Sequence, residues 1–199
     1  MDAINLRQQH YVKDIPLDYI MTADVLLATH LNGHRLSEKH GYPVRLIVPG
    51  FYGHNSVKWL CRLELSSRRA DGFFTTDLYY DLNPITGTRD PVWKSAPESL
   101  IVSPVNKSTA AGSNIEITGW AWSYSDVRLV EISTDGGASW QEAIVEPRRD
   151  LSWQRFVYRW DPPGSGPFSI LSRATDSEGN VQPLSQARNA VHRIETTVR

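Results

Sequence analysis

The sequence of 199 residues contains a single cysteine, Cys61. One thiol excludes an internal disulfide and leaves no cysteine pair with the spacing of a zinc or iron–sulfur site. Cys61 follows Trp59 and Leu60 in a segment of alternating polarity, where a free cysteine is usually a small buried hydrophobic residue. We therefore predict that Cys61 is packed and does not bind a metal.

Long apolar runs and a surplus of one charge are also lacking. No run of about 18 apolar residues is present, which predicts no membrane span. The first five residues, Met1 to Asn5, lack the basic start and apolar stretch of a signal peptide, so we expect a soluble chain whose compartment stays open. The formal net charge of −1 argues against a nucleic-acid partner, which usually requires a basic face.

Several common catalytic motifs are absent as well. The chain has no G-x-S-x-G, no P-loop lysine motif, no H-E-x-x-H and no G-x-G-x-x-G after a strand. These absences remove most hydrolase, kinase and nucleotide-binding interpretations.

The first half of the sequence is typical of an α+β fold. Pro16 opens a short helical stretch, and the run Val25–Leu31, closed by Asn32-Gly33, predicts a helix of about two to three turns. Val44–Val48 and the alternating segment Val57–Leu65 predict two strands joined by a glycine-containing loop.

Turn-forming residues become dense between about Asp81 and Pro104, which predicts a surface connection and a domain boundary near Ser95. We expect domains at 1–95 and 96–199. The second is all-β, with seven short strands typical of an immunoglobulin-like sandwich and a hairpin signal at Asp135-Gly136-Gly137. The strands are predicted at Leu100–Val105, Asn114–Trp122, Arg128–Thr134, Glu142–Val145, Gln154–Trp160, Phe168–Thr175 and His192–Val198.

The strand Asn114–Trp122 places aromatic residues on a nominally outer face. Ile115 and Ile117 point one way, and Trp120 and Trp122 point the other way. Large aromatic side chains on an outer face usually indicate that something covers it, either another domain or a second copy of the chain.

Cationic and hydrogen-bonding residues gather beside the apolar strands of the first half. Arg45 lies inside an apolar strand, and a guanidinium in that position is suited to an anionic ligand. The alternatives are a solvent-facing or locally paired Arg45, a Lys58 on the polar side of a strand, and a His40 in a loop. The members are His34, Arg35, Lys39, His40, Arg45, His54, Asn55, Ser56 and Lys58.

A specific order of residues resembles the sulfite oxidase family and the related eukaryotic nitrate reductases. It runs through Asp24–Ala28, Leu31–Gly33, His40–Arg45, Val48–Gly50, Gly53 and Val57–Leu60. The resemblance implies that this segment is one wall of a molybdopterin pocket. It also implies cofactor contacts for His40, Arg45, Ser56, Val57 and Lys58, with molybdenum-molybdopterin as the cofactor.

The second half resembles the dimerisation domain of the same family. The motifs are Gly119–Trp122, Val130–Trp140, Arg173–Asp176 and Gly179–Pro183. The resemblance implies an immunoglobulin-like fold and a homodimer. It also implies an arginine directed towards the substrate, for which Arg148, Arg149 and Arg155 are candidates.

The family binds molybdenum through a cysteine in a segment that precedes everything matched here, and Cys61 does not correspond to that ligand. We therefore expect a C-terminal portion of an oxidoreductase, with no catalytic or metal-ligating residue of its own and a separate electron acceptor such as a cytochrome. The implied reaction is oxygen-atom transfer, such as sulfite to sulfate, while another sulfur oxyanion, nitrate or an organic sulfoxide stays open.

Two other functions are compatible with the sequence. The chain is alternatively a noncatalytic dimerisation or assembly module, or one subunit of a split molybdoenzyme whose other half is a separate polypeptide. A carbohydrate- or protein-binding sandwich is less favoured, because aromatic residues in sandwiches mostly belong to cores and interfaces. Its motivation is the set Trp120, Trp122, Trp140, Trp153 and Trp160.

Overall fold

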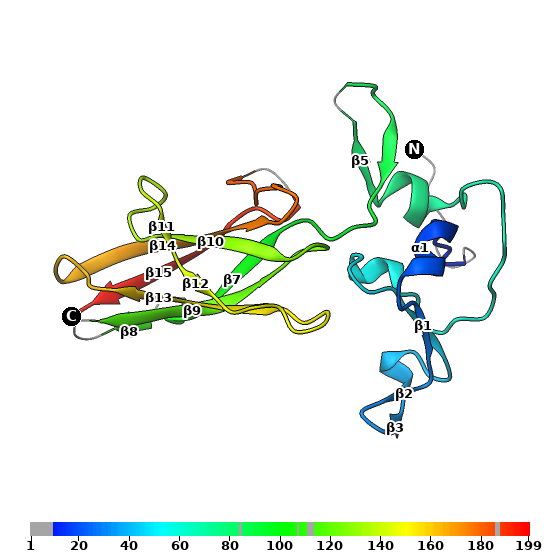
Figure 1. Ribbon diagram of the computed structural model, residues 1–199, viewed down its shortest axis with the longest axis horizontal. Helices are drawn as coiled ribbons and strands as arrows, with labels where there is room; N and C mark the ends of the chain where they lie inside the picture. The colour runs from blue at the N-terminus through cyan, green and yellow to red at the C-terminus, as the bar shows by residue number, and fades with distance from the viewer. Residues whose placement is uncertain (1–9, 84, 107, 111–113, 186–187) are drawn as a thin grey trace, which may run out of the picture. The chain divides into compact units, whose positions relative to one another are not determined.

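A computed structural model describes residues 10–83, 85–106, 108–110, 114–185 and 188–199. The chain forms two compact units, Met1–Lys94 and Ser95–Arg199 (Figure 1). Most of the regular structure is β-strand. Within the described ranges no helix is long and apolar enough to cross a membrane.

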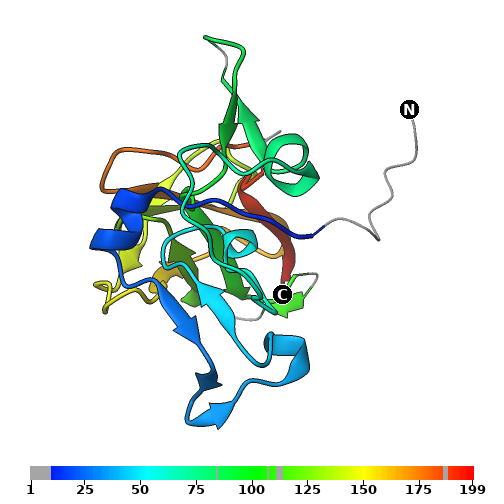
Figure 2. The same cartoon turned by 90° about the vertical axis from the view of Figure 1, so that its right-hand side faces the viewer.

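The first unit consists of short elements. Its buried apolar residues come mainly from β4 and the loops that follow it: Leu36, Leu46, Val48, Phe51 and Val92. The hairpins β2–β3 and β5–β6 extend from opposite sides of this unit (Figure 2). The elements are α1 (Leu17–Thr22), β1 (Leu26–Ala28), β2 (His30–Leu31), β3 (His34–Arg35), the 3₁₀ turns η2 (Glu38–His40) and η3 (Gly53–Asn55), β4 (Arg45–Ile47), the π-helical turn η4 (Phe73–Asp77), β5 (Tyr80–Leu82) and β6 (Arg89–Pro91).

The helix predicted after Pro16 is confirmed as α1, but the one predicted over Val25–Leu31 is wrong. That stretch forms β1, which pairs antiparallel with β4, and then β2. Asn32 and Gly33 both have positive φ, 51° and 80°, and join β2 to β3 as a two-residue hairpin turn. An Asn-Gly pair can end a helix, but it is also the strongest short-range signal for a β-hairpin, and here it forms the hairpin.

The strand predicted over Val57–Leu65 is also wrong. Only the first residues of this segment lie alongside β4. Leu46 N donates to Val57 O, and Leu60 N donates to Val44 O. Trp59, with φ of 51°, interrupts the extended backbone between them. The rest is exposed, including Leu65 at 83%. Cys61 is exposed too, so the prediction that it is packed is wrong, because its segment has no sheet to pack on.

The second unit contains two antiparallel-rich sheets that lie one over the other (Figure 1). The five-stranded sheet has the order β11-β10-β14-β15-β8, and the four-stranded sheet has the order β12-β13-β9-β7. Their inner faces meet in a core that includes Ile117, Val130, Phe156, Ile170 and Ile194. The strands are β7 (Glu98–Ser103), β8 (Ser108–Ala110), β9 (Ile115–Trp122), β10 (Val127–Ser133), β11 (Gln141–Glu142), β12 (Ile144–Val145), β13 (Gln154–Trp160), β14 (Gly166–Asp176) and β15 (His192–Val198).

Each predicted strand of the second half has a counterpart here, with two differences. The predicted strand Glu142–Val145 is divided between β11 and β12, which belong to different sheets. The edge strand β8 was missed, because three small residues that pair only with β15 carry no alternating pattern.

The predicted hairpin signal lies in the turn between β10 and β11. Gly136 and Gly137 both have positive φ, 76° and 104°. The Asp135 carboxylate accepts hydrogen bonds from the Ser139 side chain and backbone and from Ser133. These bonds hold the pKa of Asp135 below its ordinary value.

The alternation predicted for β9 is confirmed. Ile117 and Ala121 are fully buried, whereas Trp120 is 39% exposed on the opposite face. Trp122, on the same side as Trp120, stacks on Trp153 with ring centroids 4.3 Å apart. Part of the aromatic face is therefore covered within the unit, and the part around Trp120 is open.

Candidate functional site

Arg45 is held at the start of β4, beside Ala28 of β1. Its side chain is half-buried, and its Nε is buried without a hydrogen-bond partner among the described residues. Nη1 and Nη2 reach His40 O and Ser56 O only at 3.4 Å, near the upper limit for a hydrogen bond. A guanidinium whose fork is this weakly occupied retains donors for a carboxylate or phosphate.

Two side chains that follow Val57 fasten the η2 turn. Lys58 Nζ donates to Lys39 O at 2.8 Å, and Trp59 Nε1 donates to Glu38 O at 2.9 Å. His40, the last residue of η2, contacts Ser37 Oγ through its Nδ1 at 2.7 Å. Together these contacts hold the loop that presents His40 next to Arg45.

Ser56 and Val57 connect this loop to β4. Ser56 Oγ accepts a hydrogen bond from Val48 N at 3.1 Å, and Val57 O accepts one from Leu46 N at 2.8 Å. With the Arg45 contacts to His40 and Ser56, the structure brings the predicted residues His40, Arg45, Ser56, Val57 and Lys58 into one neighbourhood. The larger set of cationic and hydrogen-bonding residues predicted from the sequence is not brought together. His34 and Arg35 lie on the β2–β3 hairpin, and Asn55 is buried and donates to Val92 O.

A cavity of about 310 Å³ opens on this neighbourhood. Its lining includes Ser56, Val57 and Lys58, but His40 and Arg45 do not line it. The sequence patterns do not indicate Tyr11 and Trp59 as lining residues, and they indicate His54 only as a member of the cationic cluster. The remaining lining residues are Tyr11, Gly53, His54 and Trp59.

Tyr11 reaches the cavity from far along the chain. Its hydroxyl donates to His54 O at 2.6 Å, and the His54 ring stacks on Tyr79 with centroids 4.1 Å apart. Burial, followed by the nearby Tyr79, raises the pKa of Tyr11 to about 12. No local pattern in the sequence links residues 43 positions apart, so Tyr11 carried no signal.

Lys13 lies beside this aromatic group, half-buried, with Nζ 3.1 Å from Phe74 O and 5.0 Å from the Tyr79 ring centroid. Burial lowers the pKa of Lys13 from 10.5 to about 8. Between pH 8 and 10.5 the Lys13 amine is largely protonated in the unfolded chain and largely neutral in the folded chain. The unfolded chain therefore binds more protons, so the folded state becomes more stable as pH rises through this range. Above pH 10 the raised pKa of Tyr11 acts in the opposite direction.

We therefore expect amide protection factors across residues 72–79 to increase between pH 8 and 10, measured by hydrogen exchange. The variant Lys13→Met should show no such increase, because it lacks the titrating amine. An equal increase in the variant would contradict the assignment to Lys13.

Gly41 packs closely against Arg45 and Lys58. Its φ is +100°, and a Cβ built on it would lie 3.1 Å from Lys58 Cβ and 3.2 Å from Arg45 Cβ. The close approach of the His40 loop to Arg45 and Lys58 therefore requires the absence of a side chain at this position.

Gly41→Ala should displace the His40 loop, whereas Gly33→Ala offers a matched control. Gly33 also has positive φ, +80°, but a Cβ there meets nothing within 4 Å. Both variants pay the strain of a left-handed residue, roughly 1–2 kcal/mol, and only the first adds a clash. Hydrogen exchange of the Gly41 and Tyr42 amides, which donate to Glu38 O and Ser37 O, should rise more in Gly41→Ala. Equal effects of the two substitutions would show that packing against Arg45 and Lys58 is unimportant.

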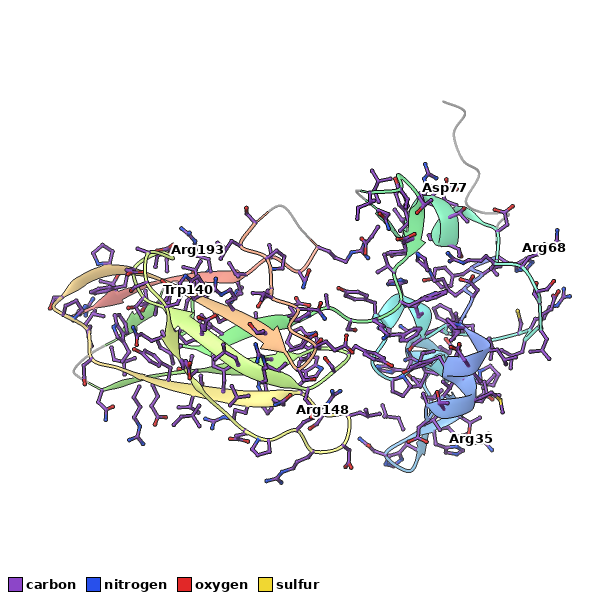
Figure 3. The ribbon with its side chains drawn as sticks, turned by 45° about the horizontal axis from the view of Figure 1, so that its top comes forward. Arg35, Arg68, Asp77, Trp140, Arg148 and Arg193 are labelled. Carbon is purple, nitrogen blue, oxygen red and sulfur yellow. The ribbon has the colours of Figure 1, made fainter. Side chains whose placement is uncertain are left out.

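The second unit contains the predicted substrate-side arginines. Arg148, in the loop that precedes β13 (Figure 3), contacts Tyr124 O and Asp126 at 3.3 Å, and its Nε is buried without a partner in the described part of the unit. Arg155 pairs with Glu146 at 3.3 Å, and Arg149 is exposed. Among the described residues no group of three or more His, Cys, Asp or Glu side chains is placed to hold a metal ion.

Comparison with known proteins gives two family matches. Residues 1–74 match the oxidoreductase molybdopterin binding domain, and residues 89–197 match the Mo-co oxidoreductase dimerisation domain. Mitochondrial sulfite oxidase of Rattus norvegicus is 32% identical over 94% of this chain and 39% of its own length. Sulfite oxidase of Arabidopsis thaliana is 31% identical over 81% of this chain and 46% of its own length.

A solved structure is also similar. The sulfane dehydrogenase SoxCD from Paracoccus pantotrophus has a TM-score of 0.77 and 31% identity, over 91% of this chain and 50% of that chain. The present chain thus spans about half the length of the SoxCD chain. It spans less than half the length of the two sulfite oxidases.

Proposed function

Because the chain belongs to the sulfite oxidase family of molybdopterin oxidoreductases, we propose that its first unit forms one wall of a molybdopterin pocket. The residues assigned to the cofactor are His40, Arg45, Ser56, Val57 and Lys58. We assign this role to residues 1–95, and a dimerisation role to residues 96–199.

The observation that carries the proposal is the Arg45 side chain. Its Nε has no partner within the described chain, and its two Nη contacts are long. A molybdopterin carries a phosphate, which accepts several hydrogen bonds and matches a guanidinium fork. Lys58 adds a second cationic side chain, whose Cβ lies beside Gly41, and Ser56, Val57 and Lys58 all line the cavity. The residues present therefore fit the phosphate end of this cofactor.

When bound, the molybdenum centre of such a cofactor supplies oxygen-atom transfer. The residues of this chain would hold the cofactor through its anionic end and orient it with donors already fixed by the η2 and β4 contacts. We propose a sulfur oxyanion such as sulfite as the substrate class, with a separate protein such as a cytochrome as electron acceptor. No catalytic or metal-ligating residue is assigned to this chain.

The second unit is proposed to be an immunoglobulin-like sandwich that forms a homodimer. Two stacked sheets with a continuous apolar core support the fold assignment. The match of residues 89–197 to a dimerisation domain supports the role.

A second candidate is a noncatalytic assembly module or one subunit of a split molybdoenzyme. The first unit favours it through its exposed apolar side chains, because Leu26 and Leu27 are each 54% exposed and Leu63 and Leu65 are 63% and 83% exposed. Exposed apolar surface of this kind is normally covered by further polypeptide.

Metal and pterin analysis of the purified chain, produced in a host that makes the cofactor, separates the two candidates. One molybdenum and one pterin per chain, with sulfite-dependent reduction of ferricyanide, would support the oxidoreductase. Complete absence of pterin would favour the assembly module and would overturn cofactor binding by this chain alone.

A further inference from the structure

Trp59 has a backbone conformation that a bulky residue rarely adopts. Its φ is 51°, in the left-handed region, where a tryptophan is sterically disfavoured. The side chain is 59% exposed, so burial in a core does not compensate for this conformation. Strained residues of this kind persist where neighbouring contacts impose them, and they concentrate at functional sites. The contacts of Trp59 therefore indicate what the strain maintains.

Those contacts converge on residues assigned to the cofactor and on the turn that carries one of them. Trp59 Nε1 donates to Glu38 O at 2.9 Å, and the same carbonyl accepts the Gly41 amide at 3.1 Å, so the indole fastens η2 at the point where this turn ends. The Lys58 ammonium lies 5.8 Å from the centre of the indole ring, within the range of a cation–π contact. Trp59 also lines the cavity. One side chain thus joins η2, Lys58 and the cavity.

The stretch Ser56–Lys58 is held differently at its two ends. The residue before it, Asn55, is fully buried, and its Nδ2 donates to Val92 O at 3.1 Å. The residue after it, Trp59, lies at the surface, and its bond to Glu38 O is exposed. A hydrogen bond in the interior is shielded from water, whereas an exposed bond competes with water and contributes less. The Trp59 end is therefore the end at which this stretch is released more easily.

We propose that Trp59 is a positioning residue, which keeps Lys58 and the η2 turn in the arrangement that binds the cofactor. The inference rests on the proposed function, in which Lys58 and His40 are assigned to the cofactor. Side chains that are fixed before binding lose little freedom when the ligand arrives, and this increases the affinity. The strain at Trp59 is offset by the fixed position of its neighbours, and Trp59 needs no contact of its own with the cofactor for this effect.

Trp59→Phe and Trp59→His separate the indole N–H from the bulk of the ring. Phenylalanine keeps an aromatic ring without a donor, whereas the imidazole Nε2–H of histidine occupies the same place in its five-membered ring as the indole Nε1–H. In chain produced with the cofactor, Trp59→Phe should lose pterin about 5-fold faster than the parent, the equivalent of one ordinary hydrogen bond. Trp59→His should stay within about 2-fold of the parent rate. Timed gel filtration followed by pterin fluorescence of the protein fraction measures these rates.

Hydrogen exchange of the full chain without cofactor tests the positioning directly. The amides of His40 and Gly41 donate to Ser37 O and Glu38 O within η2. Their exchange should be about 5-fold faster in Trp59→Phe than in the parent chain, because the turn loses the bond that fastens it. Trp59→His should restore the parent rate.

Trp153→Phe is the matched control. Trp153 is 55% exposed, similar to the 59% of Trp59, and it stacks on Trp122, but its indole N–H donates to none of the residues that the structure describes. This variant should retain pterin and protect the η2 amides as the parent chain does.

Three results would overturn the role of Trp59. The first is a Trp59→Phe variant that matches the parent chain in both measurements, and the second is a Trp153→Phe variant that changes as much as Trp59→Phe. The third is better pterin retention in Trp59→Phe than in Trp59→His, because that order would assign the effect to ring packing. A parent chain that never holds pterin overturns the proposed function as well, whereas each of the three results in a pterin-holding parent removes only the role of Trp59.

Discussion

Arg45→Met is expected to remove most of the pterin and molybdenum that the proposed pocket would hold. Methionine keeps the length and apolar stem of the side chain, so β4 and its pairing with β1 should persist. The lost guanidinium would have made charge-assisted hydrogen bonds to the phosphate, each worth about 1.5–3 kcal/mol. Two such bonds correspond to a cofactor affinity at least about 100-fold weaker. Pterin fluorescence and metal analysis per mole of chain measure this loss.

Two variants control this prediction. Arg35→Met removes an equal charge from the exposed strand β3, where Arg35 pairs with His30, and should leave the cofactor content unchanged. Arg45→Lys keeps the charge but loses the planar fork, so its cofactor content should be intermediate. Unchanged content in Arg45→Met would show that the phosphate is held elsewhere.

The second unit was largely predictable from the sequence because its strands pack on one core. Along β9, buried Ile117 and Ala121 alternate with outward Thr118 and Trp120, and both buried residues belong to the core cluster of the unit. Where one face is buried and the other is open, the period of two appears directly in the sequence. The sequence of β8, Ser-Thr-Ala, shows no such period, so this strand is not predicted.

The first unit was predicted less well because its elements are short and little of it is buried. β1 exposes both Leu26 and Leu27, so its apolar run carried neither a helical nor a strand period, and the helix interpretation was wrong. The apparent alternation after Val57 was equally uninformative. Trp59 adopts a positive φ that no sequence pattern indicates, and it interrupts the extended backbone between Val57 and Leu60.

The candidate site shows the same division. The order of residues from His40 to Lys58 predicts a common neighbourhood, and the structure brings these residues together around Arg45. That this neighbourhood holds an anion stays a prediction. The role of Gly41 as a spacer and the approach of Tyr11 to His54 depend on tertiary contacts. Such contacts join segments that are far apart along the chain, and no local sequence pattern links them.

Gly119→Ala is expected to cause the largest loss of stability of any single methyl group added to the second unit. Gly119 lies on β9 between two neighbouring strands, and a Cβ there would come within 2.1 Å of Leu100 O and 2.4 Å of Phe156 Cζ. Leu100 O is backbone, and Phe156 is fully buried, so neither can move without displacing its strand or the core. Overpacking usually costs about 1–3 kcal/mol, and a clash with backbone should reach the top of that range or exceed it.

Gly164→Ala provides the comparison, because a Cβ at Gly164 meets nothing within 4 Å and its φ is not in the left-handed region. There the added methyl restricts the unfolded chain and should stabilise the fold by about 0.4–1 kcal/mol. The two Gly→Ala changes are thus expected to have opposite signs in urea denaturation followed by tryptophan fluorescence, to which buried Trp160 contributes. A Gly119→Ala variant as stable as the parent would mean that β7 and β13 are farther from Gly119 than the register between these strands implies.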